Sequence, residues 1–387
     1  FVSSRKMAEL KIWEKIASQH VPLDFFLEIT ARCNNDCRQC YINLPAGDGE
    51  AQREELTLEE ISDIADQAVQ LGAMYCLLTG GEPLLRKDFP EIYLALKKKG
   101  LLLSVFTNAC LVNAEHMALF KKYPPQYIEV SVYGVSQETY ERVTRKPGSY
   151  AAFRRGLDLL LQSGLKVRLK AMAMRSNMHE LPEIAEFCRT HGQGGFRFDP
   201  MLHLRYDMDP LRNKEILEER LTPEEIVTVE QADEKRAEGL IQNCEHLIFS
   251  SDGHRNCNHL FHCGAGTNSF TVSYDGIFRL CADLWHPDTI YDLRKGTLAE
   301  AWNKLVLKVR DMRSDNPEFL DRCRNCPIVN LCFWCPAHAY LECGELDCMV
   351  DYYCQVAHAR AAALQESMQK QGEPGSLKTI TNQKSDV

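Results

Sequence analysis

The stretch that decides the fold is Cys-Asn-Asn-Asp-Cys-Arg-Gln-Cys-Tyr, residues 33–41, which directly follows a short apolar run at 25–30. Its three cysteines, Cys33, Cys37 and Cys40, form a C-x3-C-x2-C arrangement on one loop. Three thiolates on such a loop can hold three irons of a four-iron cluster and leave the fourth iron open. A zinc site that takes its fourth ligand from elsewhere is the alternative. The stretch therefore predicts a metal site that binds a further ligand.

Around this loop, short apolar runs alternate with amphipathic helical patterns as far as residue 199. The predicted strands are 25–30, 74–79, 101–107, 127–132, 167–174 and 195–199, and the predicted helices are 57–71, 88–99, 113–122, 150–163 and 178–191. Six strand–helix repeats predict an α/β fold with a parallel sheet that helices cover, either open or curled into a barrel. Active sites in such sheets lie at the carboxyl ends of the strands.

The second predicted strand ends in Thr79-Gly80-Gly81-Glu82-Pro83. Two glycines let the backbone approach a ligand closely, and a carboxylate beside them can accept hydrogen bonds from an ammonium group. With the cysteine loop, this motif resembles those of the radical S-adenosylmethionine (SAM) superfamily. The resemblance covers residues 24–199 and implies a partial (β/α)6 barrel of the TIM type.

The resemblance also implies a cofactor and a reaction. Cys33, Cys37 and Cys40 would ligate a [4Fe-4S] cluster whose open iron binds SAM. Reductive cleavage of SAM would give a 5′-deoxyadenosyl radical that takes hydrogen from a substrate, while the protein positions the reactants. Gly80, Gly81 and Glu82 would hold the methionyl end of SAM.

Five further positions bear on the binding of SAM, and some of them depart from the family pattern. Asn108 and Ser131 match polar positions that contact the ribose of SAM. Gln39 stands before the third cysteine, where an aromatic residue is usual, and Tyr41 follows and is expected to face adenine. Tyr133 stands where many relatives have Asp.

Ten of the 17 cysteines lie between Cys257 and Cys354. Their spacing resembles the SPASM domain of radical SAM enzymes, which holds two auxiliary clusters, so three [4Fe-4S] clusters are implied in all. By the family pattern, the ligands of the first auxiliary cluster are Cys257, Cys263, Cys281 and Cys335, and those of the second are Cys323, Cys326, Cys332 and Cys354. The spacing from Cys332 to Cys335 is x2 where x3 is usual. Zinc is the alternative metal, because C-x2-C pairs suit it as well.

A turn at Ser273-Tyr274-Asp275-Gly276 between two apolar runs predicts a tight hairpin that brings Cys263 and Cys281 together. Six cysteines remain. Four of them are expected to be buried or inert, namely Cys76, Cys110, Cys188 and Cys244. The other two, Cys343 and Cys348, flank a short loop. They are interpreted as alternative ligands, as redox-active thiols or as loop cysteines without a special role.

These patterns divide the chain into five predicted parts: an N-terminal extension (1–23), the radical SAM barrel (24–199), a helical bridge (200–243), the SPASM domain (244–365) and a flexible tail (366–387). The tail is polar and has little to bury. Because fewer than 25 residues precede the barrel in this sequence, no leader-peptide recognition domain is expected in that stretch.

The charge balance is 45 Lys and Arg against 54 Asp and Glu, a net −9, which argues against nucleic acid as a partner. No apolar stretch is long enough to span a membrane, and no secretory signal opens the chain. A cysteine-rich chain without a signal is expected in the cytoplasm, where thiols bind metals more often than they form disulfides.

Fully ligated auxiliary clusters can accept an electron from a substrate radical. The sequence is therefore interpreted as a radical SAM enzyme that crosslinks or oxidises a ribosomally made peptide or protein. An enzyme for a small biosynthetic molecule and a non-catalytic iron–sulfur or zinc module are the alternatives. The expected partners are a low-potential electron donor such as flavodoxin or ferredoxin, and a separate leader-peptide-binding protein. No general base is identified, since Asp199, Asp283 and Glu342 are interpreted as surface or capping carboxylates.

Overall fold

The computed structural model describes residues 20–194, 196–247 and 257–370, which fall into two compact units. The first unit comprises Phe1–Arg220, His259–Ser314 and Cys335–Cys348. The second comprises Leu221–Asn258, Asp315–Trp334 and Met349–Val387. Packing thus groups part of the cysteine-rich region with the barrel, and the predicted domain boundaries remain a prediction.

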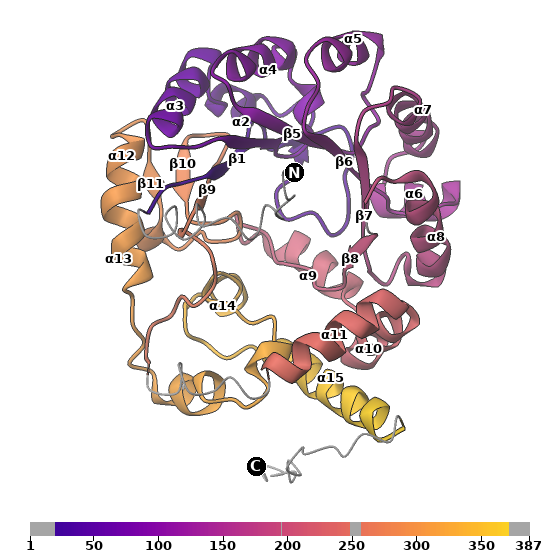
Figure 1. Ribbon diagram of the computed structural model, residues 1–387, viewed down its shortest axis with the longest axis vertical. Helices are drawn as coiled ribbons and strands as arrows, with labels where there is room; N and C mark the ends of the chain where they lie inside the picture. Colours follow the sequence, from indigo (N-terminus) through magenta and orange to yellow (C-terminus); the bar gives the residue numbers. More distant parts are fainter. Residues whose placement is uncertain (1–19, 195, 248–256, 371–387) are drawn as a thin grey trace, which may run out of the picture. The chain divides into compact units, whose positions relative to one another are not determined.

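The first unit is built on one curved sheet of nine strands in the order β11-β10-β9-β1-β4-β5-β6-β7-β8 (Figure 1). Its strands are β1 (Asp24–Glu28), β4 (Tyr75–Thr79), β5 (Leu102–Thr107), β6 (Tyr127–Ser131), β7 (Val167–Met172), β8 (Arg197–Asp199), β9 (Ser269–Val272), β10 (Ile277–Arg279) and β11 (Tyr291–Asp292). A separate small sheet pairs β2 (Arg32–Cys33) with β3 (Leu44–Pro45). The strands from β1 through β8 of the large sheet are all parallel, as expected for a partial (β/α)6 barrel.

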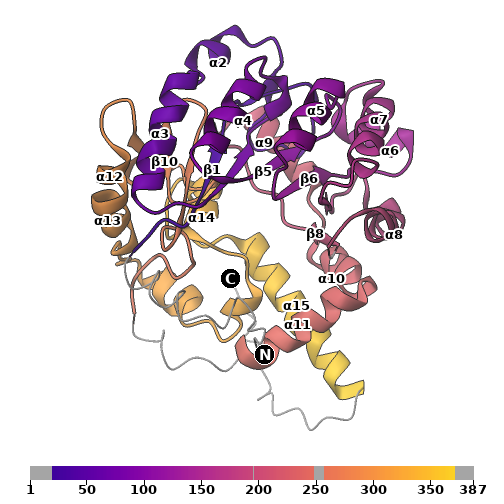
Figure 2. The same cartoon turned by 45° about the horizontal axis from the view of Figure 1, so that its top comes forward.

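Helices cover the outer face of the barrel strands (Figures 1 and 2). The helices of this unit are α2 (Gly49–Glu54), α3 (Leu58–Gln70), α4 (Phe89–Lys98), α5 (Ala114–Lys122), α6 (Gln137–Thr144), α7 (Ser149–Leu161), α8 (Leu181–His191), α9 (Pro210–Glu219), α12 (Leu298–Glu300), α13 (Val306–Arg310) and α14 (Pro336–Cys343). The predicted capping box of the first barrel helix is present, with Thr57 and Glu60 satisfying each other's backbone amides at the start of α3.

The predicted strands and helices of the barrel are confirmed, with ends that differ by a few residues. Predicted strand residue Gly195 lies outside the described residues. The short helices α2 and α6 were not predicted. Each begins at a polar N-cap, Asp48 for α2 and Ser136 for α6, whose side chain accepts bonds from the first turn.

The predicted hairpin is confirmed, since β9 and β10 pair antiparallel around Ser273–Gly276. Its position in the fold was not predicted. Strand β9 lies parallel to β1, with Asp24 opposite Ser269, so the hairpin extends the barrel sheet at its first strand.

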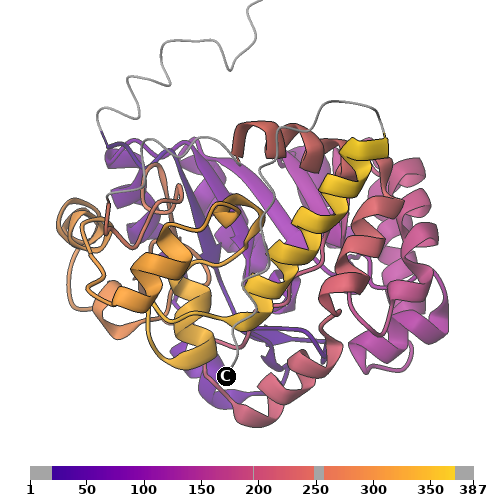
Figure 3. The ribbon, with the colours of Figure 1, turned by 90° about the horizontal axis from the view of Figure 1, so that it is seen from below.

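The second unit is helical around the cysteines. It contains α10 (Pro223–Ala232), α11 (Glu234–Leu247), a π-helical turn (Phe319–Arg324), a 3-10 turn (Val329–Leu331) and α15 (Asp351–Lys370), the long yellow helix of Figure 3. Its core joins the 3-10 turn to α15 through Ile328, Leu331, Ala357, Ala361 and Leu364. Helix α15 continues to Lys370, five residues into the segment predicted as a tail, and 371–387 lies outside the described residues.

A buried ion pair ties α10 to α15 within the second unit. The Arg360 guanidinium donates to both carboxylate oxygens of Glu230, at 2.8 and 2.7 Å, and also to the carbonyl oxygen of Leu331 at 2.9 Å. Both side chains are almost fully buried, so each charge depends on the other. In the described part of the chain, no helix combines the length and apolar character that a membrane span requires.

Candidate metal centres and active site

The loop that carries Cys33, Cys37 and Cys40 leaves the carboxyl end of β1 and is fixed at its start by Arg32. The Arg32 guanidinium donates to both carboxylate oxygens of Glu55, at 2.7 and 3.0 Å. Burial raises the pKa of the Cys37 thiol well above its usual value, and neighbouring Cys40 and Cys33 raise it further. Cys33 and Cys37 are buried and Cys40 is half-buried. Three thiols in electrostatic reach of one another would repel as thiolates unless a cation lies among them. The donor set therefore fits a metal cluster.

The two glycines after β4 bring that strand end against the residues that lead into the cysteine loop. Gly80 has φ +134°, and a Cβ there would lie 2.1 Å from the Thr30 carbonyl oxygen. At Gly81 a Cβ would lie 2.4 Å from the Arg32 carbonyl oxygen. The Gly81 amide donates to Thr30 at 2.7 Å, which holds the two segments together. The close approach that the glycines permit is to the chain's own backbone, and their contact with SAM stays a prediction.

Replacing Gly81 by Ala is expected to lower the free energy of unfolding by about 1–3 kcal/mol, because the new methyl group overlaps backbone atoms that cannot move freely. Gly47→Ala is the matched control, since nothing lies within 4 Å of a Cβ at that exposed position. Urea unfolding of the two variants measures the difference. Equal stability of both variants would show that the β1 and β4 ends are not packed as described.

The Glu82 side chain joins the glycine motif to the end of β5. It is fully buried, and its carboxylate accepts hydrogen bonds from the Leu84 amide (3.1 Å), the Thr107 hydroxyl (2.7 Å) and the Asn108 amide (2.7 Å). Burial raises the pKa of Glu82 to about 7, although these three bonds lower it. Glu82 is thus a carboxyl group that exchanges its proton near neutral pH.

The affinity for SAM is expected to rise by about tenfold from pH 6 to pH 8, because a carboxyl with a pKa of about 7 is mostly protonated at the lower pH and ionised at the higher. In the predicted contact, an ionised Glu82 would attract the amino group of SAM, and the protonated form would not. Anaerobic calorimetry on the wild type and on Glu82→Gln checks this. The variant is the control, because any pH dependence of its affinity comes from the titration of SAM itself. The same change of affinity with pH in both proteins would rule out Glu82 as the cause.

The predicted ribose-contacting residues lie beside the cysteine loop. The Asn108 amide donates to Asn34 Oδ1 at 2.9 Å and lies 3.7 Å from the Cys33 sulfur. The Tyr133 hydroxyl is in electrostatic reach of Ser131 and of the Cys37 thiol. Tyr133, which departs from the family pattern, therefore lies near a predicted cluster ligand.

Gln39 and Tyr41 differ in what surrounds them. Gln39 is buried, and its Oε1 atom has no hydrogen-bond partner among the described residues. Such an orphaned acceptor fits a site that binds a ligand with N–H groups, as adenine has. Tyr41 is in electrostatic reach of Glu28, Asp283 and Arg279 on the inner side of the sheet. With the three thiols and Glu82, these residues fit a site for a cluster and SAM.

Three of the four predicted ligands of the first auxiliary cluster, Cys263, Cys281 and Cys335, belong to the first unit. Cys281 follows β10 and is in electrostatic reach of Cys335 and Cys263, as the hairpin prediction expects. Burial raises the pKa of the Cys281 thiol, and the other two thiols raise it further. Cys257 belongs to the second unit, where it interacts with Arg324. Its role as the fourth ligand stays a prediction.

The second proposed auxiliary site is a pocket of about 330 Å³ within the second unit. The pocket is lined by all four of the predicted ligands, Cys323, Cys326, Cys332 and Cys354. Burial raises the pKa of Cys332, and the other three thiols add to the effect. Four cysteines around one pocket can bind a cluster or zinc without an open position.

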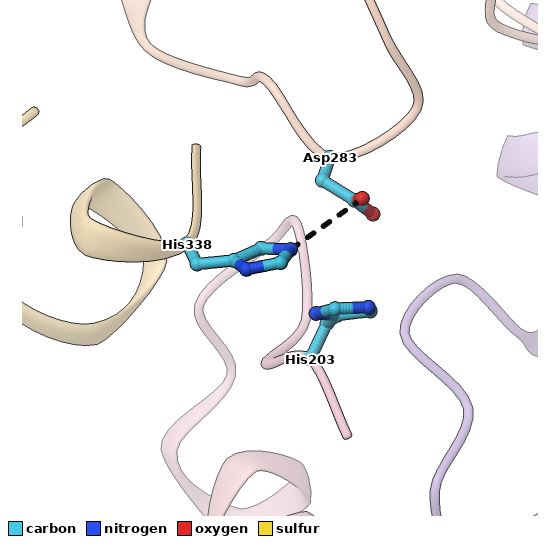
Figure 4. Close-up of side chains that lie close together, drawn as sticks. All are labelled: His203, Asp283 and His338. Carbon is cyan, nitrogen blue, oxygen red and sulfur yellow. Dashed lines mark ion pairs between the residues drawn. The ribbon is translucent and has the colours of Figure 1, made fainter. Parts of the chain in front are cut away.

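A cluster of His203, Asp283 and His338 was not predicted (Figure 4). His338 Nε2 lies 3.7 Å from an Asp283 oxygen, and the His203 and His338 rings stack with centroids 4.0 Å apart. Burial opposes ionisation of Asp283, but the two histidines outweigh it and lower its pKa. The rings are within 27° of parallel, so their in-plane lone pairs do not converge on one ion. The arrangement fits an ion pair better than a metal site.

The prediction for the three acidic residues is therefore wrong for Asp283 and for Glu342. Asp283 faces His338, and Glu342 is bound to Arg220 as an ion pair that is largely buried. Asp199 caps a turn, because its carboxylate accepts from the Met201 amide at 3.0 Å.

The predictions for the six remaining cysteines can also be compared with the structure. Cys110 is close to the cysteine loop, since its sulfur lies 3.8 Å from the Asn35 amide nitrogen and interacts with Cys33. Cys343 and Cys348 are joined by a disulfide, with Cα atoms 6.6 Å apart. The predicted inert thiols Cys76 and Cys188 are buried, and nothing is described of the Cys244 side chain.

Fold and loop together define the class: a parallel-barrel enzyme whose site lies where a three-cysteine loop leaves the first strand. Residues 27–188 match the Radical SAM superfamily, and residues 263–327 match SPASM, an iron-sulfur cluster-binding domain. The chain is therefore a radical SAM/SPASM enzyme, and it resembles peptide maturases.

Similar proteins include modifiers of peptides and of small molecules. The chain is 25% identical over 329 residues to Fe-coproporphyrin III synthase of Methanosarcina barkeri, covering 79% of this chain and 80% of that protein. It is 27% identical over 325 residues to the antilisterial bacteriocin subtilosin biosynthesis protein AlbA of Bacillus subtilis, covering 81% and 67%. The structure of Streptococcus suis SuiB bound to SAM has a TM-score of 0.61 at 14% identity, covering 92% and 82%.

Proposed function

We propose that this enzyme modifies a ribosomally made peptide or protein by radical chemistry that ends in a crosslink or an oxidised side chain. The observation that carries the proposal is the pocket of four cysteines in the second unit. A cluster that protein ligands saturate has no open iron for substrate, so its chemical use is to accept or pass an electron. Crosslinking and side-chain oxidation after hydrogen abstraction both require such an acceptor.

The proposed cofactors are SAM and three [4Fe-4S] clusters on the cysteine sets described above. When bound, they supply reductive cleavage of SAM and the abstraction of a hydrogen atom from the substrate. The chain's own residues bind and orient: Cys33, Cys37 and Cys40 hold the cluster, Glu82 accepts from the amino group of SAM, and Gln39 offers its free Oε1 to adenine. Asn108 and Ser131 would contact the ribose of SAM.

A peptide substrate is supported by two of the similar proteins. AlbA takes part in the biosynthesis of a bacteriocin, and SuiB has also been solved bound to its precursor peptide SuiA, with a TM-score of 0.62. A small-molecule substrate is the second candidate, supported by the similarity to Fe-coproporphyrin III synthase. We further propose a low-potential donor such as flavodoxin or ferredoxin, a separate leader-peptide-binding protein, and a cytoplasmic location, which suits many free cysteines.

Co-expression with a short cysteine-rich or repeat-bearing peptide encoded beside this gene tests the proposal. Mass spectrometry is expected to show the loss of two hydrogen atoms for each crosslink, because forming one bond between two C–H or S–H positions removes one hydrogen from each. Fragment ions then locate the bond. An unmodified peptide, together with conversion of a porphyrin by the same preparation, would favour the small-molecule enzyme.

A further inference from the structure

A fully buried ion pair lies on the inner face of the sheet, where β1 and β10 end. Glu28 is the last residue of β1, Arg279 is the last residue of β10, and both side chains are inaccessible to solvent. The guanidinium contacts Glu28 Oε2 and the Ala282 carbonyl oxygen. It also lies over the Trp285 ring, 3.6 Å from the ring centroid. Arg279 is thereby fixed in position from three sides.

Polar atoms around this pair lack hydrogen-bond partners in the described part of the chain. They are Glu28 Oε1, Arg279 Nε, Trp285 Nε1 and Thr271 Oγ1. The sheet register places Thr271 opposite both Phe26 and Arg279, so its side chain shares a face with Glu28 and Arg279. The other face of these strands is apolar and carries the stacked rings of Phe25, Phe270 and Phe278. Four orphaned polar atoms around one side chain mark a place where a polar partner is missing.

This place adjoins the proposed radical site. Tyr41, which follows cluster ligand Cys40, is in electrostatic reach of both Glu28 and Arg279. A substrate group held by these residues would therefore lie beside the cysteine loop. A radical enzyme needs its substrate fixed close to the site where the radical forms, because hydrogen abstraction depends on the position of the reacting atoms.

The charges select a neutral partner. Glu28 is balanced by Arg279, and Asp283 is balanced by His338. A carboxylate or phosphate would have to displace Glu28 from Arg279, and an ammonium would have to displace Arg279 from Glu28. Breaking a buried pair is costly in either case. The polar atoms without a partner are one carboxylate acceptor, two N–H donors and one hydroxyl, which suit a neutral group.

We propose that Glu28, Arg279, Thr271 and Trp285 form a recognition site for an amide group of the substrate, a peptide bond or a side-chain carboxamide. The amide N–H donates to Glu28 Oε1, and its carbonyl oxygen accepts from Arg279 Nε and Trp285 Nε1. Thr271 adds a bond from its hydroxyl. The inference rests on the proposed function and deepens it, because it distinguishes a peptide from the carboxylate-rich porphyrins of the small-molecule alternative.

Binding of N-acetylglycine N′-methylamide to the reconstituted chain with SAM tests the site, with acetate and methylammonium as charged comparisons. Saturation-transfer NMR is expected to show that the amide binds and that acetate and methylammonium do not. Thr271→Val and Trp285→Phe should each weaken binding about fivefold, the effect of one hydrogen bond. Thr271→Val removes a buried hydroxyl that has no hydrogen-bond partner among the described residues, so the free energy of unfolding should not fall.

Thr289→Val is the matched control. Thr289 is equally buried, but its hydroxyl donates to the His286 carbonyl oxygen at 2.7 Å. This variant should lose stability and keep its affinity for the amide. Preferred binding of acetate or methylammonium, absence of amide binding, or unchanged affinity in Thr271→Val and Trp285→Phe would each overturn the proposal. Cleavage of SAM by the unmodified chain without the amide reports separately on the proposed function.

Discussion

A chain in which Cys33, Cys37 and Cys40 are all replaced by Ala is expected to form no 5′-deoxyadenosine and to lose about four of about twelve irons, the content of one four-iron cluster among three. Cys33 and Cys37 are buried, Cys40 is half-buried, and the three thiols lie in electrostatic reach of one another on that loop. The remaining irons stay with the C-terminal cysteines, which belong to other segments of the chain. Anaerobic iron analysis and chromatography of the SAM products measure both effects.

Cys76→Ala is the matched control for this variant. Cys76 lies on β4, is buried like Cys33 and Cys37, and has its pKa raised by burial alone, without a neighbouring thiol. Its replacement removes a small apolar side chain and should leave the iron content unchanged. If the triple variant still cleaved SAM, the assignment of the open cluster to this loop would be wrong.

Replacing Cys323 and Cys326 together by Ala is expected to empty the pocket of the second unit and lower the iron content by about four per chain. A metal held by these cysteines would join the turn at 319–324 to α15 through Cys354, so its loss should also lower the unfolding temperature. Iron, zinc and sulfide analysis together with thermal unfolding test this.

Cys343 and Cys348 provide the control for that pair. They are also two cysteines of the C-terminal region, but they form a disulfide and are not among the residues that line the pocket. Their double replacement by Ser should retain all of the iron. One zinc per chain in the wild type, lost from the Cys323/Cys326 variant, would instead establish the zinc site.

The barrel was predictable because its signals are local. Apolar runs with the period of a strand, followed by amphipathic helices such as 58–70 with its capping box, appear directly in the sequence. The cysteine loop and the glycine motif were predictable for the same reason, since each is a contiguous stretch whose spacing limits the chemistry. Helices α2 and α6 were missed because they are short and depend on one N-cap side chain each.

Other features depend on pairing between distant segments, which no local pattern encodes. Strand β9 lies next to β1 because Phe25 and Phe270 stack across the two strands, and either phenylalanine alone would suit any buried strand. The ion pair of Glu28 with Arg279 follows from that pairing. The stacking of His203 on His338 likewise joins two segments that are far apart in the sequence. Cys110 does not belong to any cysteine motif of the sequence, so its position beside the cysteine loop was not expected.

The most direct test of the central claim is the reductive cleavage of SAM by the wild-type chain. After anaerobic reconstitution with iron and sulfide, incubation with SAM and dithionite should release 5′-deoxyadenosine and methionine in equal amounts, and omission of the reductant should abolish both. Such a result requires a cluster with an iron open to SAM. A chain that holds about twelve irons, the content of three four-iron clusters, but releases no 5′-deoxyadenosine would contradict the account and identify a non-catalytic iron–sulfur protein.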